Sequence, residues 1–314
     1  MQEELNIKQV FVLKILYGND KMKKGALEMN YSPLRYPGGK SKLTPLVEKL
    51  MQSANINNGV YVEPFVGGGG VALSLLINKK VRKIIINDYD IAIYSVWYAI
   101  LNETNKFLEM IDNAVLTVDE WKKQKEFYIK NKTTYSIELA FATFYLNRTN
   151  RSGILKAGPI GGYEQKGNYP ISARFNKAKL KERVQLIASY KTQIELYNLE
   201  IKSFIKNVIP KLDNDSFIYF DPPYFKKGKE LYTNFFNPCD HEELSKLIFD
   251  VPLTWMITYD DVLEIEKLYT TKSLKRFDIN YSVANSGKKR EIIALSHNYW
   301  PNATELKSLK MNIW

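Results

Sequence analysis

The sequence predicts an α/β fold in which a parallel sheet is interrupted by a mainly helical insertion. Runs of β-branched and aromatic residues lie at 59–66 and 84–86, and each is followed by apolar residues with helical spacing. A third run, at 217–220, appears only after about a hundred residues without a strand pattern. Because strands that alternate with helices form βαβ units, we expect a parallel sheet that is buried on both faces.

The first two units each place polar or glycine residues at the end of a strand. GVYVEPFV (59–66) is closed by four glycines, and the helix-like segment VALSLLINKK follows. The second run ends at Asn87 and Asp88 and continues into IAIYSVWYAILNET, which also reads as a helix. Both units therefore predict strand, turn and helix in that order.

The middle of the chain predicts helices, and the last third predicts strands again. TVDEWKKQKEFYIKN (117–131) and SIELAFATFYLN (136–147) are long, helical in spacing and rich in aromatic residues. After FIYF (217–220) come the strand LTWMITYDD (253–261) and a hairpin formed by RFDINYSV and REIIALSH. The α/β fold is therefore expected to be split by the helical segment.

The composition favours a globular protein with a polyanionic partner. The chain has 314 residues, 45% of them hydrophobic, and a formal net charge of +11. Such a charge favours nucleic acid, although ribosome-associated and membrane-surface proteins are also basic. One cysteine, Cys239, excludes an intrachain disulfide, and two histidines cannot complete the familiar zinc spacings. We therefore expect no metal and a cytoplasmic location. The apolar run 10–17 is too short for a signal peptide or a membrane span.

The glycine-rich turn at 67–70 indicates a cofactor that contains adenosine, but leaves its identity open. Glycines at a strand-to-helix turn allow a ligand to approach the backbone and the helix amides. Gly67, Gly69 and Ala72 also satisfy a dinucleotide fingerprint, and Asp88 stands about where a ribose-binding acid is expected. The alternatives are a turn without a ligand, and a role for Asp88 in capping the next helix.

The segment Asp221-Pro222-Pro223-Tyr224 favours methyl transfer to an amino group over hydride transfer. Ligands bind at the carboxyl ends of parallel strands, so Asp221 should face the same crevice as Asp88. The prolines hold backbone carbonyls rigidly, the carboxylate adds an acceptor, and Tyr224 offers a flat face for stacking. These groups suit an exocyclic amine on a heterocycle, and they would stabilise the positive charge that develops on its nitrogen.

Four motifs, in order, resemble the Dam-type (D12 class) DNA adenine-N6 methyltransferases. They are RYPGGKSKL (35–43), EPFVGGGGV (63–71), IINDYD (85–90) and DPPY (221–224). The resemblance covers roughly residues 31–296. It implies a Rossmann-like sheet of seven strands, S-adenosylmethionine as methyl donor, double-stranded DNA as partner and an adenine flipped out of the duplex.

The resemblance also implies the residues of the site, without a metal. The catalytic residues would be Asp221, Pro222, Pro223 and Tyr224. The cofactor-binding residues would be Tyr36, Pro37, Gly38, Gly39, Lys40, Glu63, Pro64, Phe65, Gly67, Gly69, Asp88, Tyr89 and Asp221. Asp88 would be the ribose acid, and Tyr224 would stack on the target base.

A basic segment within the insertion is the predicted DNA-binding region. Residues 147–180 contain seven Lys or Arg against a single acid, Glu164. The alternative is a solvated basic face. Ser152 replaces an asparagine that is usual in the family, so the recognition sequence cannot be transferred. The predicted DNA-binding residues are Arg148, Asn150, Arg151, Ser152, Lys156 and Arg174.

The predicted domains follow from this division. Residues 1–28 would be an N-terminal extension, 29–104 and 205–314 the catalytic domain, and 105–204 the target-recognition insertion. FKKGKELYTNFFN, after DPPY, either closes over the flipped base or forms a surface loop with Phe235 and Phe236 in the core.

Three functions stay open on the sequence alone. The leading one is a site-specific DNA adenine-N6 methyltransferase, either solitary or paired with a restriction endonuclease. An RNA or cytosine-N4 amino methyltransferase would keep the same fold and site. A catalytically silent DNA-binding relative would use only the insertion.

Overall fold

The computed structural model describes residues 31–36, 39–226, 228, 234–280, 288–309 and 311–314, and the predicted extension 1–28 lies outside them. The chain forms two compact units. Of the described residues, the helical unit comprises 31–36, Gly39 and Asp90–Leu196, and the sheet unit comprises those within Lys40–Tyr89 and Tyr197–Trp314.

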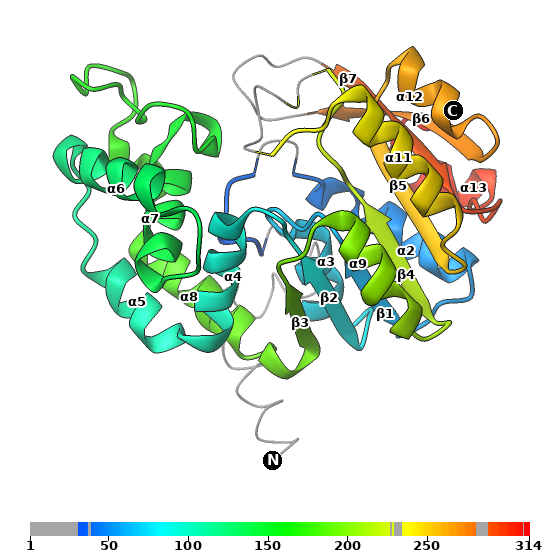
Figure 1. Cartoon of the computed structure of the whole chain (residues 1–314), viewed down its shortest axis with the longest axis horizontal. Coiled ribbons are helices and arrows are strands. Elements are labelled where there is room, and N and C mark those ends of the chain that lie inside the picture. Colours follow the sequence, from blue (N-terminus) through cyan, green and yellow to red (C-terminus); the bar gives the residue numbers. More distant parts are fainter. Residues whose placement is uncertain (1–30, 37–38, 227, 229–233, 281–287, 310) are drawn as a thin grey trace. The chain divides into compact units, whose positions relative to one another are not determined.

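A seven-stranded sheet, as predicted, organises the fold (Figure 1). Its order is β3 (Ile194–Tyr197), β2 (Lys83–Asn87), β1 (Val60–Glu63), β4 (Ser216–Phe220), β5 (Thr254–Asp260), β7 (Lys288–Leu295) and β6 (Ser273–Asn280). Strand β1 pairs in parallel with β2 and β4, and β4 pairs in parallel with β5. Strands β6 and β7 are antiparallel, which confirms the predicted hairpin, and β7 continues the sheet from β5. The sheet confirms the Rossmann-like class.

Successive side chains along each strand point to opposite faces of the sheet, and helices cover both faces. Ile218 and Phe220 of β4, with Trp255 and Ile257 of β5, belong to one buried hydrophobic cluster. That cluster also contains side chains of α9 (Ile201–Asn207), α11 (Pro238–Phe249) and α12 (Leu263–Tyr269), which cover this face of the sheet. Because strand side chains alternate, Tyr219 and Asp221 point to the other face. That face carries α2 (Thr44–Ser53) and α3 (Gly70–Ile77) (Figure 1).

The described part of the helical unit contains five principal helices. They are α4 (Ile91–Asn102), α5 (Thr104–Asp112), α6 (Val118–Asn131), α7 (Ile137–Thr149) and α8 (Lys177–Ala188). The side chains of Thr117 and Ser136 cap α6 and α7 by accepting hydrogen bonds from the amides of Glu120 and Leu139. The two helices predicted from periodicity are therefore present with nearly their predicted bounds. Between α7 and α8 lie short 3-10 turns at Arg151–Gly153 and Ile171–Arg174.

Candidate active site

The carboxyl ends of β1, β2 and β4 lie side by side in the sheet unit. Val62 pairs with Ile85 of β2 and with Ile218 of β4, so the three strands end at the same edge. Pro64, Asp88 and Asp221 follow these strands directly, and Phe65 comes next after Pro64. The sequence expectation that Asp88 and Asp221 share one edge with the glycine turn is therefore confirmed.

The glycine turn requires glycine and is tied to Asp88. Gly67 and Gly69 have φ angles of 45° and 59°, in the left-handed region that glycine adopts without strain. The amide of Gly67 donates a hydrogen bond to Asp88 Oδ2 at 2.9 Å. The capping alternative for Asp88 is wrong, because Asp90 caps α4 by accepting from the Ala92 amide at 2.9 Å. Asp88 instead fixes the turn that precedes α3.

The side chain of Asn87 forms hydrogen bonds with the loops that follow β1 and β3 at this edge. Its side-chain amide donates to the carbonyls of Pro64 and Leu199 at 2.9 and 3.0 Å, and its oxygen accepts from the Leu199 amide at 2.8 Å. Asn198 in turn donates to the carbonyl of Asp88 at 2.7 Å. The loop after β3 is therefore held against the ends of β1 and β2.

Glu63 lies beneath the glycine turn. It is 5% exposed, and its Oε1 accepts hydrogen bonds from Tyr61 OH at 2.9 Å and from the Ala72 amide at 3.2 Å. Burial, assisted by the charge of Asp221, raises the pKa of Glu63 to about 8. The bond from Ala72 connects β1 to α3, and the bond from Tyr61 of the same strand holds the carboxyl group in place, so Glu63 supports the turn from inside.

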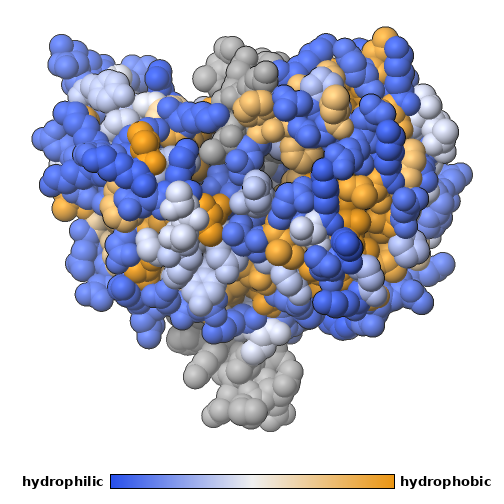
Figure 2. Space-filling view, viewed as in Figure 1, coloured by the Kyte–Doolittle hydropathy of each residue, from blue (hydrophilic) through white to orange (hydrophobic). Residues whose placement is uncertain are grey.

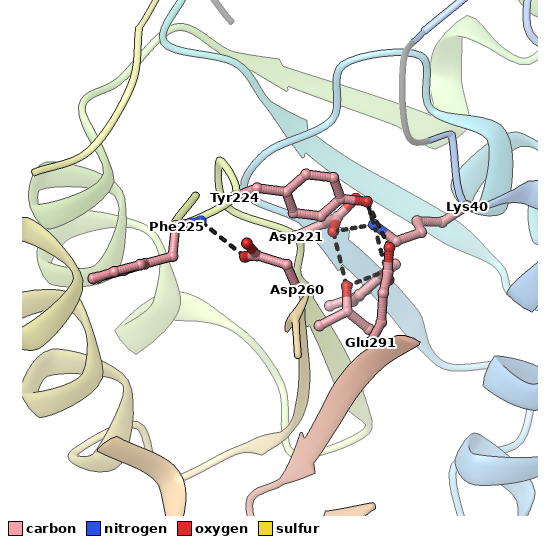
Figure 3. Close-up of polar contacts among 8 residues, drawn as sticks. Lys40, Asp221, Tyr224, Phe225, Asp260 and Glu291 are labelled. Atoms are coloured by element: carbon pink, nitrogen blue, oxygen red, sulfur yellow. Dashed lines mark hydrogen bonds and ion pairs between the residues drawn. The ribbon is translucent and has the colours of Figure 1, made fainter. Parts of the chain in front are cut away.

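Asp221 is held through one of its two carboxylate oxygens (Figure 3). Its Oδ1 accepts from Lys40 Nζ and from Thr258 Oγ1, both at 2.8 Å. Thr258 in turn accepts from Tyr219 OH at 2.8 Å, since its own proton is given to Asp221. Asp221 Oδ2 and the carbonyl of Pro222 accept no hydrogen bond from the residues that the structure describes. About a quarter of the Asp221 side chain is exposed.

Tyr224 is oriented by a buried carboxylate on β7. Its hydroxyl donates to Glu291 Oε1 at 2.6 Å and accepts from Lys40 Nζ at 3.2 Å. Lys40 Nζ is also 3.5 Å from Glu291 Oε2. Lys40 and Glu291 are 4% and 2% exposed in their side chains, so this charge pair is buried (Figure 3). The DPPY tyrosine, with only 6% of its surface exposed, is thus locked in one orientation.

Asp260 holds the chain that leaves DPPY. Its two oxygens accept from the amides of Phe225 at 2.8 Å and Lys226 at 3.0 Å (Figure 3). Asp260 stands opposite Glu291 in the β5–β7 register, so both side chains point to the same face of the sheet. The two acids therefore fix DPPY from neighbouring strands.

A cavity of about 350 Å³ opens in the sheet unit. Phe65 and Tyr89, two of the predicted cofactor residues, line it. The other lining residues are Glu200, Ile201, Lys202, Asn234, Phe235, Phe236, Asp240, Leu244 and Leu247. On the face that carries α9 and α11, hydrophobic residues reach the surface in patches between polar ones (Figure 2). The volume and the mixed lining are those of a small-molecule site.

Phe236 packs edge-on against Phe65, with ring centroids 6.1 Å apart, while Phe235 is 39% exposed. The core placement considered for both rings therefore holds for Phe236 alone. Parts of this segment, 227 and 229–233, lie outside the described residues.

Sequence reasoning missed Thr258, Asp260, Glu291 and Glu200. The first three occupy one face of their strands, and period-two alternation in LTWMITYDD and REIIALSH could have placed them there. Glu200 follows β3 by three residues and caps α9, accepting from the amides of Lys202 and Ser203 at 2.9 and 3.3 Å. No strand was predicted before Glu200, so this acid lacked the signal that Asp88 and Asp221 had, and β3 (Ile194–Tyr197) was itself missed.

The remaining predicted cofactor residues belong to the segment 36–40. The carbonyl of Tyr36 accepts from the amide of Gly39 at 3.1 Å, and Tyr36 is half-buried in the helical unit. Pro37 and Gly38 lie outside the described residues. Lys40 is the member of this segment that the structure places at Asp221.

The predicted DNA-binding residues all lie in the helical unit, with different exposure. Arg151, Lys156 and Arg174 are exposed, whereas Arg148 and Ser152 are half-buried. Asn150 is buried: it accepts from Trp121 Nε1 at 2.6 Å and donates to the carbonyl of Ile154 at 2.9 Å. The side chain of Asn150 therefore shapes the loop that carries its neighbours.

Two absences apply to the described part of the chain. Within it, no group of three His, Cys, Asp or Glu side chains is arranged to hold a metal ion. None of the helices found there combines the length and the apolar character that crossing a membrane requires.

Comparison with known proteins gives one family. The chain is 29% identical over 234 residues to the type II methyltransferase M.MjaIII of Methanocaldococcus jannaschii, which covers 68% of this chain and 77% of that protein. It is 23% identical over 290 residues to the DNA adenine methylase of Haemophilus influenzae, covering 83% and 92% of the two chains. The solved structure of the rRNA methyltransferase aviRa from Streptomyces viridochromogenes covers 84% of this chain and 88% of its own at 12% identity, but its TM-score of 0.36 is too low to bear on function.

Residues 36–283 match the D12 class of N6 adenine-specific DNA methyltransferases, a span that contains the glycine turn, Asp88 and DPPY. S-adenosylmethionine is therefore the methyl donor. The chain belongs to the D12 class of N6 adenine-specific DNA methyltransferases.

Proposed function

We propose that Asp221, Pro222, Pro223 and Tyr224 carry the transfer of a methyl group to the N6 amine of an adenine in double-stranded DNA. The proposal depends on two neighbouring hydrogen-bond acceptors, the Asp221 carboxylate and the Pro222 carbonyl. Asp221 Oδ2 and the Pro222 carbonyl accept no hydrogen bond from the described residues, while Lys40 and Thr258 hold Asp221 through Oδ1. An amine with two protons matches two such acceptors.

These acceptors have a role in the transition state. As the amine forms a bond to the methyl carbon, positive charge develops on its nitrogen, and a carboxylate and a carbonyl stabilise this charge. After the transfer, the methylated amine releases one proton to solvent. Asp221 holds the amine in its orientation until then. Because Lys40 and Thr258 fix the carboxylate beforehand, little reorganisation accompanies the reaction.

The cofactor would be held by residues at the carboxyl ends of β1, β2 and β3. S-adenosylmethionine, when bound, supplies an electrophilic methyl group on a sulfonium. Phe65, Tyr89, Ile201 and Phe236 offer apolar surface for its adenine in the cavity, and the Glu200 carboxylate offers an acceptor at the rim. Asp88, which orders the glycine turn, is the candidate ribose acid. Tyr36, Gly39, Lys40, Glu63, Pro64, Gly67 and Gly69 stay in this proposal as residues that bind the cofactor or support its site.

The target adenine would stack on Tyr224 after leaving the duplex. Only 6% of Tyr224 is exposed, so the residues that cover its ring must move aside to admit the base. The hydroxyl donates to Glu291 at 2.6 Å, which fixes the direction in which the ring extends. The base would then meet a ring that is already oriented.

The helical unit would supply target recognition. Its candidate DNA contacts are Arg148, Arg151, Ser152, Lys156 and Arg174, with Asn150 shaping the loop between them. The predicted division into a catalytic domain (29–104 and 205–314) and an insertion (105–204) is part of this proposal. Relatives named as type II methyltransferases or modification methylases support a partner restriction endonuclease for this chain, and a location with the DNA in the cytoplasm.

The test is transfer of labelled methyl from S-adenosylmethionine to mixed-sequence duplex DNA, followed by digestion to nucleosides. We expect the label in N6-methyldeoxyadenosine, and mapping of the modified sites then gives the recognition sequence. Label in N4-methylcytosine, or in RNA alone, would replace the proposed target. If the protein binds DNA tightly but transfers no label, it would be a catalytically silent, DNA-binding relative of the family.

A further inference from the structure

Four arginines from distant segments gather in the helical unit, and we call them the arginine cluster. They are Arg35, Arg148 in the last turn of α7, Arg174 and Arg183 in α8. Three of them donate to main-chain carbonyls: Arg35 Nη1 to Asn150 at 3.0 Å, Arg148 Nε to Arg174 at 2.7 Å, and Arg183 Nη1 to Ser32 at 3.0 Å. Arg174 lies over the ring of Tyr169, 5.9 Å from its centroid.

Among the residues that the structure describes, the arginine cluster has no acidic partner. In the ranges that the structure describes, none of its members forms an ion pair with a carboxylate. Burial and the repulsion of Arg35, Arg183 and Arg174 together lower the pKa of Arg148 to about 9. Burial, followed by repulsion from Arg174, also lowers the pKa of Arg35. Like charges that are partly removed from water are unfavourable until an anion joins them.

The backbone holds this unfavourable arrangement in place. The Asn147 side chain accepts from the Arg35 amide at 2.7 Å and donates to the carbonyls of Arg35 and Gly153 at 2.8 and 3.0 Å. Gly153 has a φ of 76°, and a Cβ there would lie 2.2 Å from the Arg35 carbonyl oxygen. Arg35 is therefore fixed beside the end of α7 before any ligand binds.

We propose that the arginine cluster binds a phosphodiester group of the DNA substrate. Guanidinium groups match phosphate oxygens with paired donors, which the ammonium group of lysine does not offer. The segment 147–180 around the cluster carries seven basic residues against one acid, which suits a polyanion rather than a single small carboxylate. Arg35 and Arg183 thereby join Arg148 and Arg174 as DNA contacts. This inference rests on the proposed function, because it takes DNA as the substrate.

The test compares Arg183→Gln with Lys130→Gln, a matched control. Lys130 is exposed, pairs with Glu126 at 2.6 Å on α6, and its replacement removes the same charge from the same unit. DNA binding of the full-length protein is measured by fluorescence anisotropy over a series of salt concentrations. We expect Arg183→Gln to weaken binding roughly tenfold and to reduce the salt slope by about 0.9, the loss of one phosphate contact. Lys130→Gln should behave as the wild type does.

A stability measurement separates binding from a structural role. If Arg183 were structural, its loss would lower the melting temperature; if repulsion dominates, Arg183→Gln melts no lower than Lys130→Gln. Inorganic phosphate should raise the melting temperature of the wild type more than that of Arg183→Gln, at equal ionic strength. Arg174→Gln, at an exposed position, repeats the DNA measurement if Arg183→Gln does not fold.

Three outcomes are distinct. Equal DNA binding by Arg183→Gln, Arg174→Gln and Lys130→Gln, in a wild type that methylates DNA, overturns the inference and leaves the proposed function. A phosphate effect without a DNA effect also overturns it, because the cluster would then be a site for a free anion. Weakened binding in Arg183→Gln, with a wild type that binds DNA but never methylates it, supports the cluster and removes the proposed function.

Discussion

Lys40 Nζ lies 2.8 Å from Asp221 Oδ1, and the same ammonium lies 3.5 Å from Glu291 Oε2. One buried cation therefore joins the carboxylate of DPPY to the carboxylate that orients Tyr224. A single side chain thus contacts both the proposed acceptor for the amine and the hydroxyl of the ring proposed to stack on the base.

Lys40→Met should impair both the fold and the reaction. Removing one partner of a buried charge pair costs up to about 3–5 kcal/mol, since the remaining carboxylates lose their counter-charge. We expect kcat to fall at least tenfold, with a lower free energy of unfolding in urea. The control is Lys49→Met, which breaks the exposed Lys49–Glu305 pair of the same unit.

Glu291→Gln should partly rescue Lys40→Met. Glutamine removes the buried negative charge but keeps an oxygen that accepts from Tyr224 OH. The double variant should therefore be more stable than Lys40→Met alone, with a coupling of about 1 kcal/mol or more in a double-mutant cycle. Additive effects would show that the pair is not coupled.

Asp221→Ala should slow methyl transfer by orders of magnitude without unfolding the protein. Loss of the acceptor that faces the developing charge is expected to reduce kcat by roughly 10²–10³. DNA binding, measured separately, should stay near wild type. Asp213→Ala, at a side chain that is 78% exposed, is the control. A variant at position 221 with near-normal turnover would remove the proposed role of this carboxylate.

Glu63 should make stability depend on pH. Its pKa is raised to about 8 by burial, against 4.5 for an ordinary glutamate. Below pH 4.5 both the folded and the unfolded states are protonated, and the contribution of Glu63 to stability is fully present. As the pH rises from 4.5 through 8, the unfolded state alone releases the proton, so the free energy of unfolding falls by up to about 1.4 kcal/mol per unit.

Glu63→Gln tests this because it keeps the oxygen that accepts from Tyr61 OH and Ala72. Urea unfolding across this pH range should show a flatter profile for the variant than for the wild type. Parallel profiles would mean that Glu63 is ionised throughout and that its two hydrogen bonds outweigh its burial.

The sequence was most informative where local pattern and chemistry coincide. Strand runs that end in Asp88 and Asp221, and glycines that require left-handed φ angles, predicted the edge of the sheet that carries the site. Thr258 and Glu291 were not predicted, because alternation gives the face of a side chain but not the register that sets strand β7 beside β5. Arg148 and Arg174 of the arginine cluster were predicted as DNA contacts, but Arg35 and Arg183 were missed for a similar reason. Arg183 looks like part of an ordinary basic helix until the fold brings it to Arg148.

Glu200 allows the cofactor site to be tested apart from the stability of its helix. Its carboxylate lines the cavity and also caps α9 through the amides of Lys202 and Ser203. Glu200→Ala should lose both roles: about 1 kcal/mol of stability from the cap and several-fold in affinity for S-adenosylhomocysteine. Glu200→Ser restores a capping oxygen, so its melting temperature should recover while its affinity, measured by calorimetry, stays low. Recovery of affinity together with stability would show that Glu200 acts only on the helix, and the cavity would then hold the cofactor through its aromatic residues alone.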